Sequence, residues 1–313
     1  MKNRVLLLLI TVLCLLSAPA WAKEGGDQYP NGAENWGVGA APPPGHYYVN
    51  YLAYYAGKLK DGAGNDALDG VDTPQANASI EGLRYIEMTH LKIFGGQYGM
   101  HVIVPLAYQS AYMGGRASVT NIGDIFINPF ILAWHHPQWH ALVGVDIYLP
   151  TGYYDKNDSR VSLGSNYYGF DPLVAFSYLP HSGWEASTKF MYNLKTTNGA
   201  TNYRSGQDFH ADYAAGKHFG KSLLGVTGYA LKQTTDDAVN GQVVAASAGL
   251  WDAGRRGQVF AIGPSLGYVN KRGVSFTAQW QHETLVRNRF SGDKIWFKAV
   301  MPVSALSLRR VAQ

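Results

Sequence analysis

Residues 184–195 read W-E-A-S-T-K-F-M-Y-N-L-K, and this stretch alternates between two kinds of side chain. One set is mostly apolar and consists of Trp184, Ala186, Thr188, Phe190, Tyr192 and Leu194. The other set is mostly polar and consists of Glu185, Ser187, Lys189, Met191, Asn193 and Lys195. A period of two residues places the two sets on opposite faces of an extended chain, so the stretch predicts a β-strand and not a helix.

The same alternation recurs along the chain and predicts about twelve strands of membrane-spanning length. They are expected at 46–57, 79–94, 97–112, 121–135, 139–151, 167–179, 184–196, 206–218, 221–233, 257–270, 274–286 and 292–302. The second segment alternates poorly, because Glu81, Arg84 and Glu87 do not share one face.

The connections between these segments alternate in length. The short ones are Gly95-Gly96, 136–138, 180–183, 219–221 and 271–273. The long ones are 58–77, 113–120, 152–166, 197–205, 234–256 and a shorter one at 287–291. Short periplasmic turns and longer extracellular loops are typical of an outer-membrane barrel. The sequence therefore predicts an all-β, transmembrane antiparallel β-barrel with both chain ends in the periplasm.

The first residues predict export. A cationic start is followed by an apolar run ending at Leu16 and by Ala20-Trp21-Ala22, which is typical of a signal peptide cleaved after Ala22. The single cysteine, Cys14, lies inside it, so the mature chain would have neither disulfides nor thiolate metal ligands. Without Lys2 and Arg4 the net charge falls from +4 to +2, which gives no reason to expect a nucleic-acid partner.

A soluble β-sandwich or jelly roll would also alternate, since one face of each strand would enter a core. Two features favour the membrane. Aromatic residues gather near strand ends, as they do in interfacial girdles, among them Tyr47, Tyr48, Trp139, Trp296 and Phe297. The polar faces also carry charges in mid-strand, which suits a wet lumen.

Three motifs resemble one family of outer-membrane proteins. They are G-A-A-P-P-P-G-H-Y-Y at 39–48, N-I-G-D-I at 121–125 followed by Asn128-Pro129, and G-P-S-L-G-Y at 263–268. The chain resembles the meta-pathway phenol degradation family over essentially all of its mature length. The resemblance implies a channel associated with aromatic-compound breakdown, with distant similarity to transporters of hydrophobic substrates. Many barrels end on an aromatic residue, whereas this chain continues to Gln313.

The inward polar face holds the candidate functional residues, because a charge facing lipid at mid-membrane costs about 2–4 kcal/mol for Lys or Arg. The lumen-facing candidates are Asp124, Asn128, Asp146, Tyr148, Asp171, Glu185, Lys189, Asn193, Asp208, His210, Asp212, Gln279, Gln281, Glu283, Lys294 and Lys298. These side chains either solvate and brace the lumen or guide a substrate, and the sequence leaves both roles open.

Other chemistry has weaker support in the sequence. Asp208, His210 and Asp212 alternate on one face, but a strand separates each pair by about 7 Å, too far for all three to hold one ion unaided. Residues 61–69 faintly resemble a calcium loop but lack its closing glutamate. No serine lies in a nucleophile elbow. Neither a metal nor another cofactor is expected.

These observations divide the chain into a signal peptide (1–22), an N-terminal segment (23–45), a barrel (46–303) and a tail (304–313). The N-terminal segment is expected in or under the lumen, with Trp36, Pro42, Pro43 and Pro44 as plug candidates. The expected function is passive uptake of small hydrophobic or aromatic solutes across the outer membrane, with membrane lipids as the other partners. A lipid-modifying barrel enzyme and a surface-structural barrel remain alternatives.

Overall fold

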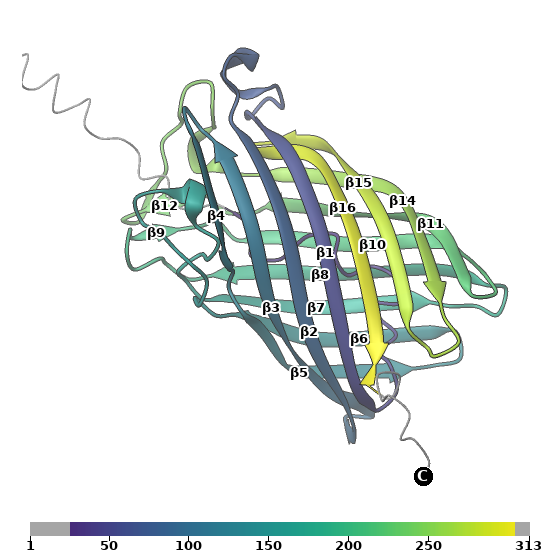
Figure 1. The fold of residues 1–313 in the computed structure, drawn as a ribbon. Helices are drawn as coiled ribbons and strands as arrows, with labels where there is room; N and C mark the ends of the chain where they lie inside the picture. Colours follow the sequence, from purple (N-terminus) through teal and green to yellow (C-terminus); the bar gives the residue numbers. More distant parts are fainter. Residues whose placement is uncertain (1–25, 304–313) are drawn as a thin grey trace, which may run out of the picture.

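The protein is a closed antiparallel β-barrel in the computed structural model, which describes residues 26–303 (Figure 1). The expected signal peptide and C-terminal tail lie outside the described residues. The wall contains β1 (Gly45–Lys60), β2 (Gln75–Ile93), β3 (Gly96–Tyr112), β4 (Arg116–Ile122), β5 (Phe126–His135), β6 (Trp139–Tyr148), β7 (Gly169–Tyr178), β8 (Trp184–Lys195), β10 (Asp208–Phe219), β11 (Ser222–Gln233), β14 (Gln258–Val269), β15 (Ser275–Arg287) and β16 (Arg289–Pro302).

Closure follows from the pairing of the first strands. β1 pairs with both β16 and β2, and β2 also pairs with β3. β4 and β5 pair one after the other with β3, so they are two halves of a single wall strand. The sheet of 13 strands is therefore a twelve-stranded barrel, which confirms the predicted fold class.

The long loops gather at one end of the barrel and the short turns at the other (Figure 1). The loops contain η1 (Ala67–Gly70), η2 (Ser159–Val161), η3 (Ala253–Arg255) and a small sheet of β9 (Tyr203–Arg204), β12 (Ala238–Val239) and β13 (Gln242–Val243). Within residues 26–303 there is no helix of the length and apolarity needed to cross a membrane.

The fourth wall strand differs from the prediction of one strand at 121–135. β4 begins earlier, at Arg116, and the chain leaves the sheet between Gly123 and Ile125 before β5. The Asp124 carboxylate accepts hydrogen bonds from the backbone N–H groups of Gly152 and Ser165, at 3.0 and 2.7 Å. These bonds attach the 149–168 loop, and not another strand, to the wall beside β4.

The outer surface carries a band of exposed apolar side chains, including Leu52, Leu83, Leu106, Phe176, Leu224, Leu266 and Phe297. Trp139, Trp184 and Phe219 are exposed beside the short turns. Such a band with aromatic residues at its edge is the lipid-facing surface of a membrane barrel. Trp296 was expected in this girdle, but it is only 2% exposed and packs inside against Tyr51.

Candidate functional site

Residues 26–39, here called the lumen segment, run through the barrel from the long-loop end to the short-turn end (Figure 1). At the long-loop end, the carbonyl of Gly26 accepts a hydrogen bond from Lys195 Nζ on β8. At the other end, the Gly39 N–H donates to Ser177 Oγ on β7, 2.9 Å away. The chain then turns through three prolines into β1, so the segment occupies the lumen over most of its height.

Asp212 on β10 is the main anchor of the lumen segment. Its carboxylate accepts the Tyr29 hydroxyl at 2.6 Å and the backbone N–H groups of Gly32 and Glu34 at 2.8 and 3.1 Å. From β15, the Gln279 and Gln281 amides donate to the Gly32 carbonyl at 2.9 and 3.2 Å. A buried carboxylate that accepts several N–H and O–H donors makes strong, charge-assisted hydrogen bonds.

Trp36 fills the part of the lumen nearer the short-turn end. Its Nε1 donates to Ser265 Oγ at 2.8 Å, and its ring lies against paired glycines, Gly216 and Gly225. A Cβ at either glycine would come within 2.7 Å of the ring, so the absence of side chains there makes the room. The three prolines instead lie at the short-turn mouth, where Pro43 and Pro44 are exposed.

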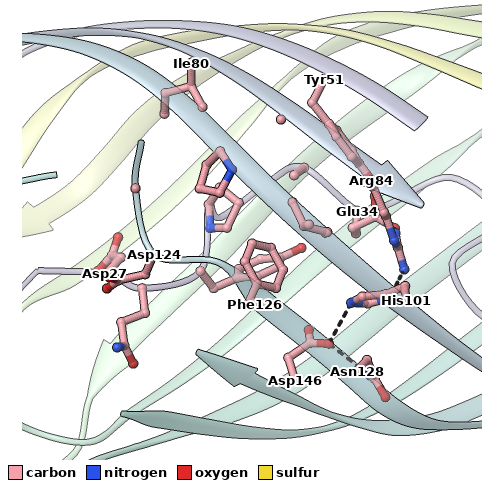
Figure 2. A pocket seen from close by; sticks show the side chains of 18 of the residues that line it. Asp27, Glu34, Tyr51, Ile80, Arg84, His101, Asp124, Phe126, Asn128 and Asp146 are labelled. Atoms are coloured by element: carbon pink, nitrogen blue, oxygen red, sulfur yellow. Dashed lines mark hydrogen bonds and ion pairs between the residues drawn. The ribbon is translucent and has the colours of Figure 1, made fainter. Parts of the chain in front are cut away.

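A ladder of charged and polar groups crosses the opposite wall (Figure 2). Glu34 of the lumen segment lies 3.0 Å from the Arg84 guanidinium, whose other nitrogen lies 2.6 Å from Nδ1 of His101. Nε2 of His101 is 3.2 Å from Asp146, which in turn accepts the Asn128 amide at 2.9 Å. The ladder joins the lumen segment to β2, β3, β6 and β5.

Sequence reasoning missed three members of this ladder, Glu34, Arg84 and His101. On β2 the inward positions are Ala78, Ile80, Gly82 and Arg84, whereas Glu81 points outward and accepts the Asn50 amide. The outward carboxylate obscured the alternation of that strand. Comparing the basic residues that face inward on β2 and β3 with the acidic residues of the N-terminal segment would have revealed the pairing of Arg84 with Glu34.

The ladder forms one side of an inner cavity of about 230 Å³, which lies between the lumen segment and mainly strands β2 to β7 and is also lined by Arg84, His101 and Asp146 (Figure 2). Most of its surface is apolar and comes from Ile80, Ile103, Pro105, Ala107, Phe126, Ile131, Leu142 and Leu173. Gly123 and Asp124, at the break between β4 and β5, also line it. The cavity therefore reaches the one place where a loop, and not a strand, completes this part of the wall.

A second cavity of about 370 Å³, here called the vestibule, lies at the long-loop end. It shares Tyr29, Pro30, Ala78, Ile80 and Gln109 with the inner cavity, so the two volumes adjoin. The lumen segment thus leaves one side of the lumen unfilled, from the extracellular loops to the polar ladder.

The triplet on β10 does not converge on one point. Asp208 pairs with Lys195, His210 lies 3.1 Å from Asp171, and Asp212 holds the lumen segment. Among residues 26–303 no three His, Cys, Asp or Glu side chains gather closely enough to hold a metal ion. Alternation on one strand brought these groups to the same face, but neighbouring strands supplied each with its own partner.

Most other candidates are buried and engaged with neighbours. Glu185 accepts the Gly37 N–H at 2.6 Å, and Glu283 accepts the hydroxyls of Tyr55 and Tyr229. Ammonium groups lie over aromatic rings, Lys189 at 4.2 Å from Tyr29 and Lys294 at 4.5 Å from Tyr229. Tyr148 donates to Asp171, Lys298 donates to the Ala33 carbonyl, and Asn193 is 1% exposed.

Asp27 forms the upper lock of the lumen segment. Both nitrogens at the end of the Arg289 side chain reach its carboxylate, at 2.6 and 3.1 Å. Burial alone would raise the pKa of Asp27, but the Arg289 guanidinium, together with the charges of Lys195 and Lys294, outweighs burial and lowers the pKa to about 2. The pair therefore remains charged at any physiological pH.

Comparisons with known proteins agree with this architecture. The family model described as "Putative MetA-pathway of phenol degradation" matches residues 56–299. A search of curated proteins returned no match. Among solved structures, the chain is similar to the COG4313 outer membrane channel from Pseudomonas putida F1, with a TM-score of 0.69, 13% identity, and coverage of 83% of this chain and 96% of that chain.

Two other barrels are more distant. One is the TodX deltaS2S3 mutant monoaromatic hydrocarbon channel, with a TM-score of 0.45, 10% identity, and coverage of 84% of this chain and 91% of that chain. The other is a Pseudomonas aeruginosa FadL homologue, with a TM-score of 0.40, 10% identity, and coverage of 91% and 98%. At such identities the similarity of the Pseudomonas putida channel shows the barrel fold and nothing more specific.

Proposed function

Because the chain belongs to the MetA-pathway phenol degradation family, we propose that it is an outer-membrane channel for passive uptake of small hydrophobic or aromatic compounds. The inner cavity carries this proposal. It is a mostly apolar chamber of about 230 Å³, bounded on one side by the polar ladder, and it adjoins the vestibule beside residues 26–39. On the apolar side of this chamber, an aromatic ring would exchange water for Ile80, Ile103 and Phe126.

The proposed route starts at the vestibule and continues past Tyr29 and Ile80 into the inner cavity. The ladder from Glu34 to Asn128 forms the polar side of this cavity, and its charged groups disfavour passage of an apolar solute on that side. Beside it, the wall at Gly123 and Asp124 is completed by the 149–168 loop, which is held by the two Asp124 bonds, by the bond from the Ile125 N–H to Thr151 Oγ1, and by backbone bonds to Ile122 and Ile125. Movement of this loop would give the solute an exit that avoids the ladder.

Uptake of a labelled neutral aromatic, such as toluene, into proteoliposomes tests the proposal. Ala107→Phe inserts a ring into the cavity, so we expect it to reduce uptake strongly while the barrel remains folded. Leu106→Phe is the matched control, since Leu106 is the preceding residue on β3 and is exposed on the lipid side. Equal uptake by protein-free liposomes, or equal uptake by the two variants, would overturn the channel proposal.

The channel is proposed in preference to a lipid-modifying enzyme, since the buried histidines His101 and His210 each face an aspartate and not a serine. The same proteoliposomes distinguish the two functions. Release of fatty acid from their phospholipid, lost on His210→Gln, would support the enzyme. Uptake without lipid hydrolysis supports the channel over both the enzyme and a surface-structural barrel.

A further inference from the structure

The charged groups of the vestibule differ in how many hydrogen-bond partners they have. The cations and anions that line it balance in number: Arg160, Arg255, Arg289 and Lys294 against Asp27, Asp208, Asp237 and Glu283. Net charge therefore gives the vestibule no preference between anions and cations. Any preference must come from the hydrogen bonds that these groups already make.

All four carboxylates are already engaged. Asp27 accepts Arg289 and the Asn31 amide, and Asp208 accepts Lys195. Asp237 accepts the Tyr203 hydroxyl, the Gly206 N–H and the Gln233 amide. Glu283 accepts two tyrosine hydroxyls and the Gly292 N–H. A cationic ligand would have to compete with these donors for the same oxygens.

Within residues 26–303, two of the cations, Arg255 and Lys294, make no hydrogen bond or salt bridge to a carboxylate, although Arg255 acts on Asp237 and Lys294 on Glu283 through space. The Arg255 guanidinium makes no side-chain hydrogen bond within the described residues, and its Nε is buried without a partner. It lies 5.3 Å from the ring of Trp251, whose Nε1 is also buried without a partner. Lys294 donates only to the Asn31 carbonyl and otherwise lies over the Tyr229 ring.

Buried donors without acceptors are costly, and they are satisfied by a ligand that supplies acceptor oxygens. A guanidinium over an indole ring whose N–H is also unpaired could present both donors to a carboxylate, which takes hydrogen bonds on both oxygens. Trp251, Phe290 and Leu231 line the same vestibule and offer apolar surface to a ring. From these contacts we propose that the vestibule is a binding site for aromatic monocarboxylates, with Arg255 and the Trp251 N–H holding the carboxylate.

This inference rests on the proposed uptake function and names the class of solute that the outer cavity takes first. The channel would then collect acidic aromatics from dilute solution in a site about 370 Å³ in volume, within the range of small-molecule pockets. Neutral aromatic solutes would enter the channel without first binding at this site.

Binding of benzoate to the detergent-solubilised full-length protein, measured by titration calorimetry, tests the site directly. Benzamide and benzylammonium are the comparison ligands, because they keep the ring and change the charge. We expect benzoate to bind at least about tenfold more tightly than either, since a hydrogen bond to a charged group is worth about that factor or more. Equal affinity for the three ligands would overturn the inference.

Arg255→Gln should weaken benzoate binding by about ten- to hundredfold and leave benzamide binding almost unchanged. Arg256→Gln removes the same charge one residue later, from an exposed side chain paired with Asp236, and should change neither. Trp251→Phe keeps a ring and removes the N–H, so it should weaken benzoate binding less than Arg255→Gln. An equal loss in the two arginine variants would reduce the effect to general electrostatics and contradict the site.

Toluene uptake separates this inference from the channel proposal. Retained uptake of toluene by Arg255→Gln, with loss of benzoate binding, supports both. Normal uptake with no benzoate binding by the unaltered protein overturns the carboxylate site alone. Specific benzoate binding without uptake of any aromatic overturns the channel and leaves the site in place.

Discussion

The two sides of the lumen follow the same alternation and yet differ in content. On the side of β8, β10, β14 and β15, the inward residues include Glu185, Asp212, Ser265 and Gln279, and each bonds the lumen segment. On the side of β2 to β6 most inward residues above the polar ladder are apolar, and a cavity remains. Polar wall positions matched to the segment hold it in place, whereas apolar ones leave space that suits an apolar solute.

The largest effect is expected when the lumen segment, which fills one side of the lumen, is removed. Deleting residues 27–38 should raise the ion conductance of the channel in planar bilayers several-fold, because the lumen of twelve strands exceeds that of a side-chain-filled eight-stranded barrel. A heat-modifiability gel would verify that the shortened chain still folds. Unchanged conductance of the folded variant would show that the lumen segment does not limit the pore.

A smaller effect is expected where the two sides meet, at Arg84. Arg84→Met leaves Glu34 without its closest cation, and breaking a buried pair should cost about 3 kcal/mol in the free energy of unfolding. Urea unfolding in lipid vesicles measures this change. Lys60→Met is the control, since the Lys60–Asp66 pair is partly exposed and should cost less than about 1 kcal/mol. Equal losses would argue against the ladder as a stabilising element.

Next in size is the anchor on the filled side. Asp212→Asn removes the charge that accepts three donors of the lumen segment, so the segment should be less tightly held by roughly 2 kcal/mol. Faster cleavage after Glu34 by a glutamate-specific protease reports this loosening. Asp293→Asn, on the exposed outer face, should leave the cleavage rate unchanged. Resistance equal to that of the unaltered protein would contradict the anchoring role.

The smallest expected effect is a pH dependence at the upper lock. The pKa of Asp27 is lowered to about 2, so its stabilisation is complete above its ordinary pKa of 3.8 and is lost as the pH falls toward 2. Conductance recorded between pH 5 and pH 2 should therefore rise at the acid end. Asp27→Asn should remove that rise, and an unaltered profile in the variant would point to other groups.

Sequence patterns predicted the barrel, its twelve strands, the alternation of short turns and long loops, and the family, all of which are confirmed. The predictions were wrong where a contact with a distant part of the chain overrode the local pattern. The break at Gly123 depends on Asp124 bonding a loop about 30 to 40 residues away, and Glu81 faces outward with Asn50 as its partner. Neither contact leaves a trace in the periodicity of one strand.

What the sequence alone determined is therefore local: which stretches extend, which face of each strand is polar, and where the chain turns. These properties follow from the two-residue period and from turn residues, both of which act over a few positions. The tertiary structure decided which inward groups meet. Tyr29 bonds Asp212 across 183 positions of sequence, and that contact exists only once the sheet has closed with its register fixed. The cavity is a consequence of the same closure, since it is the part of the lumen that the returning N-terminal segment does not fill.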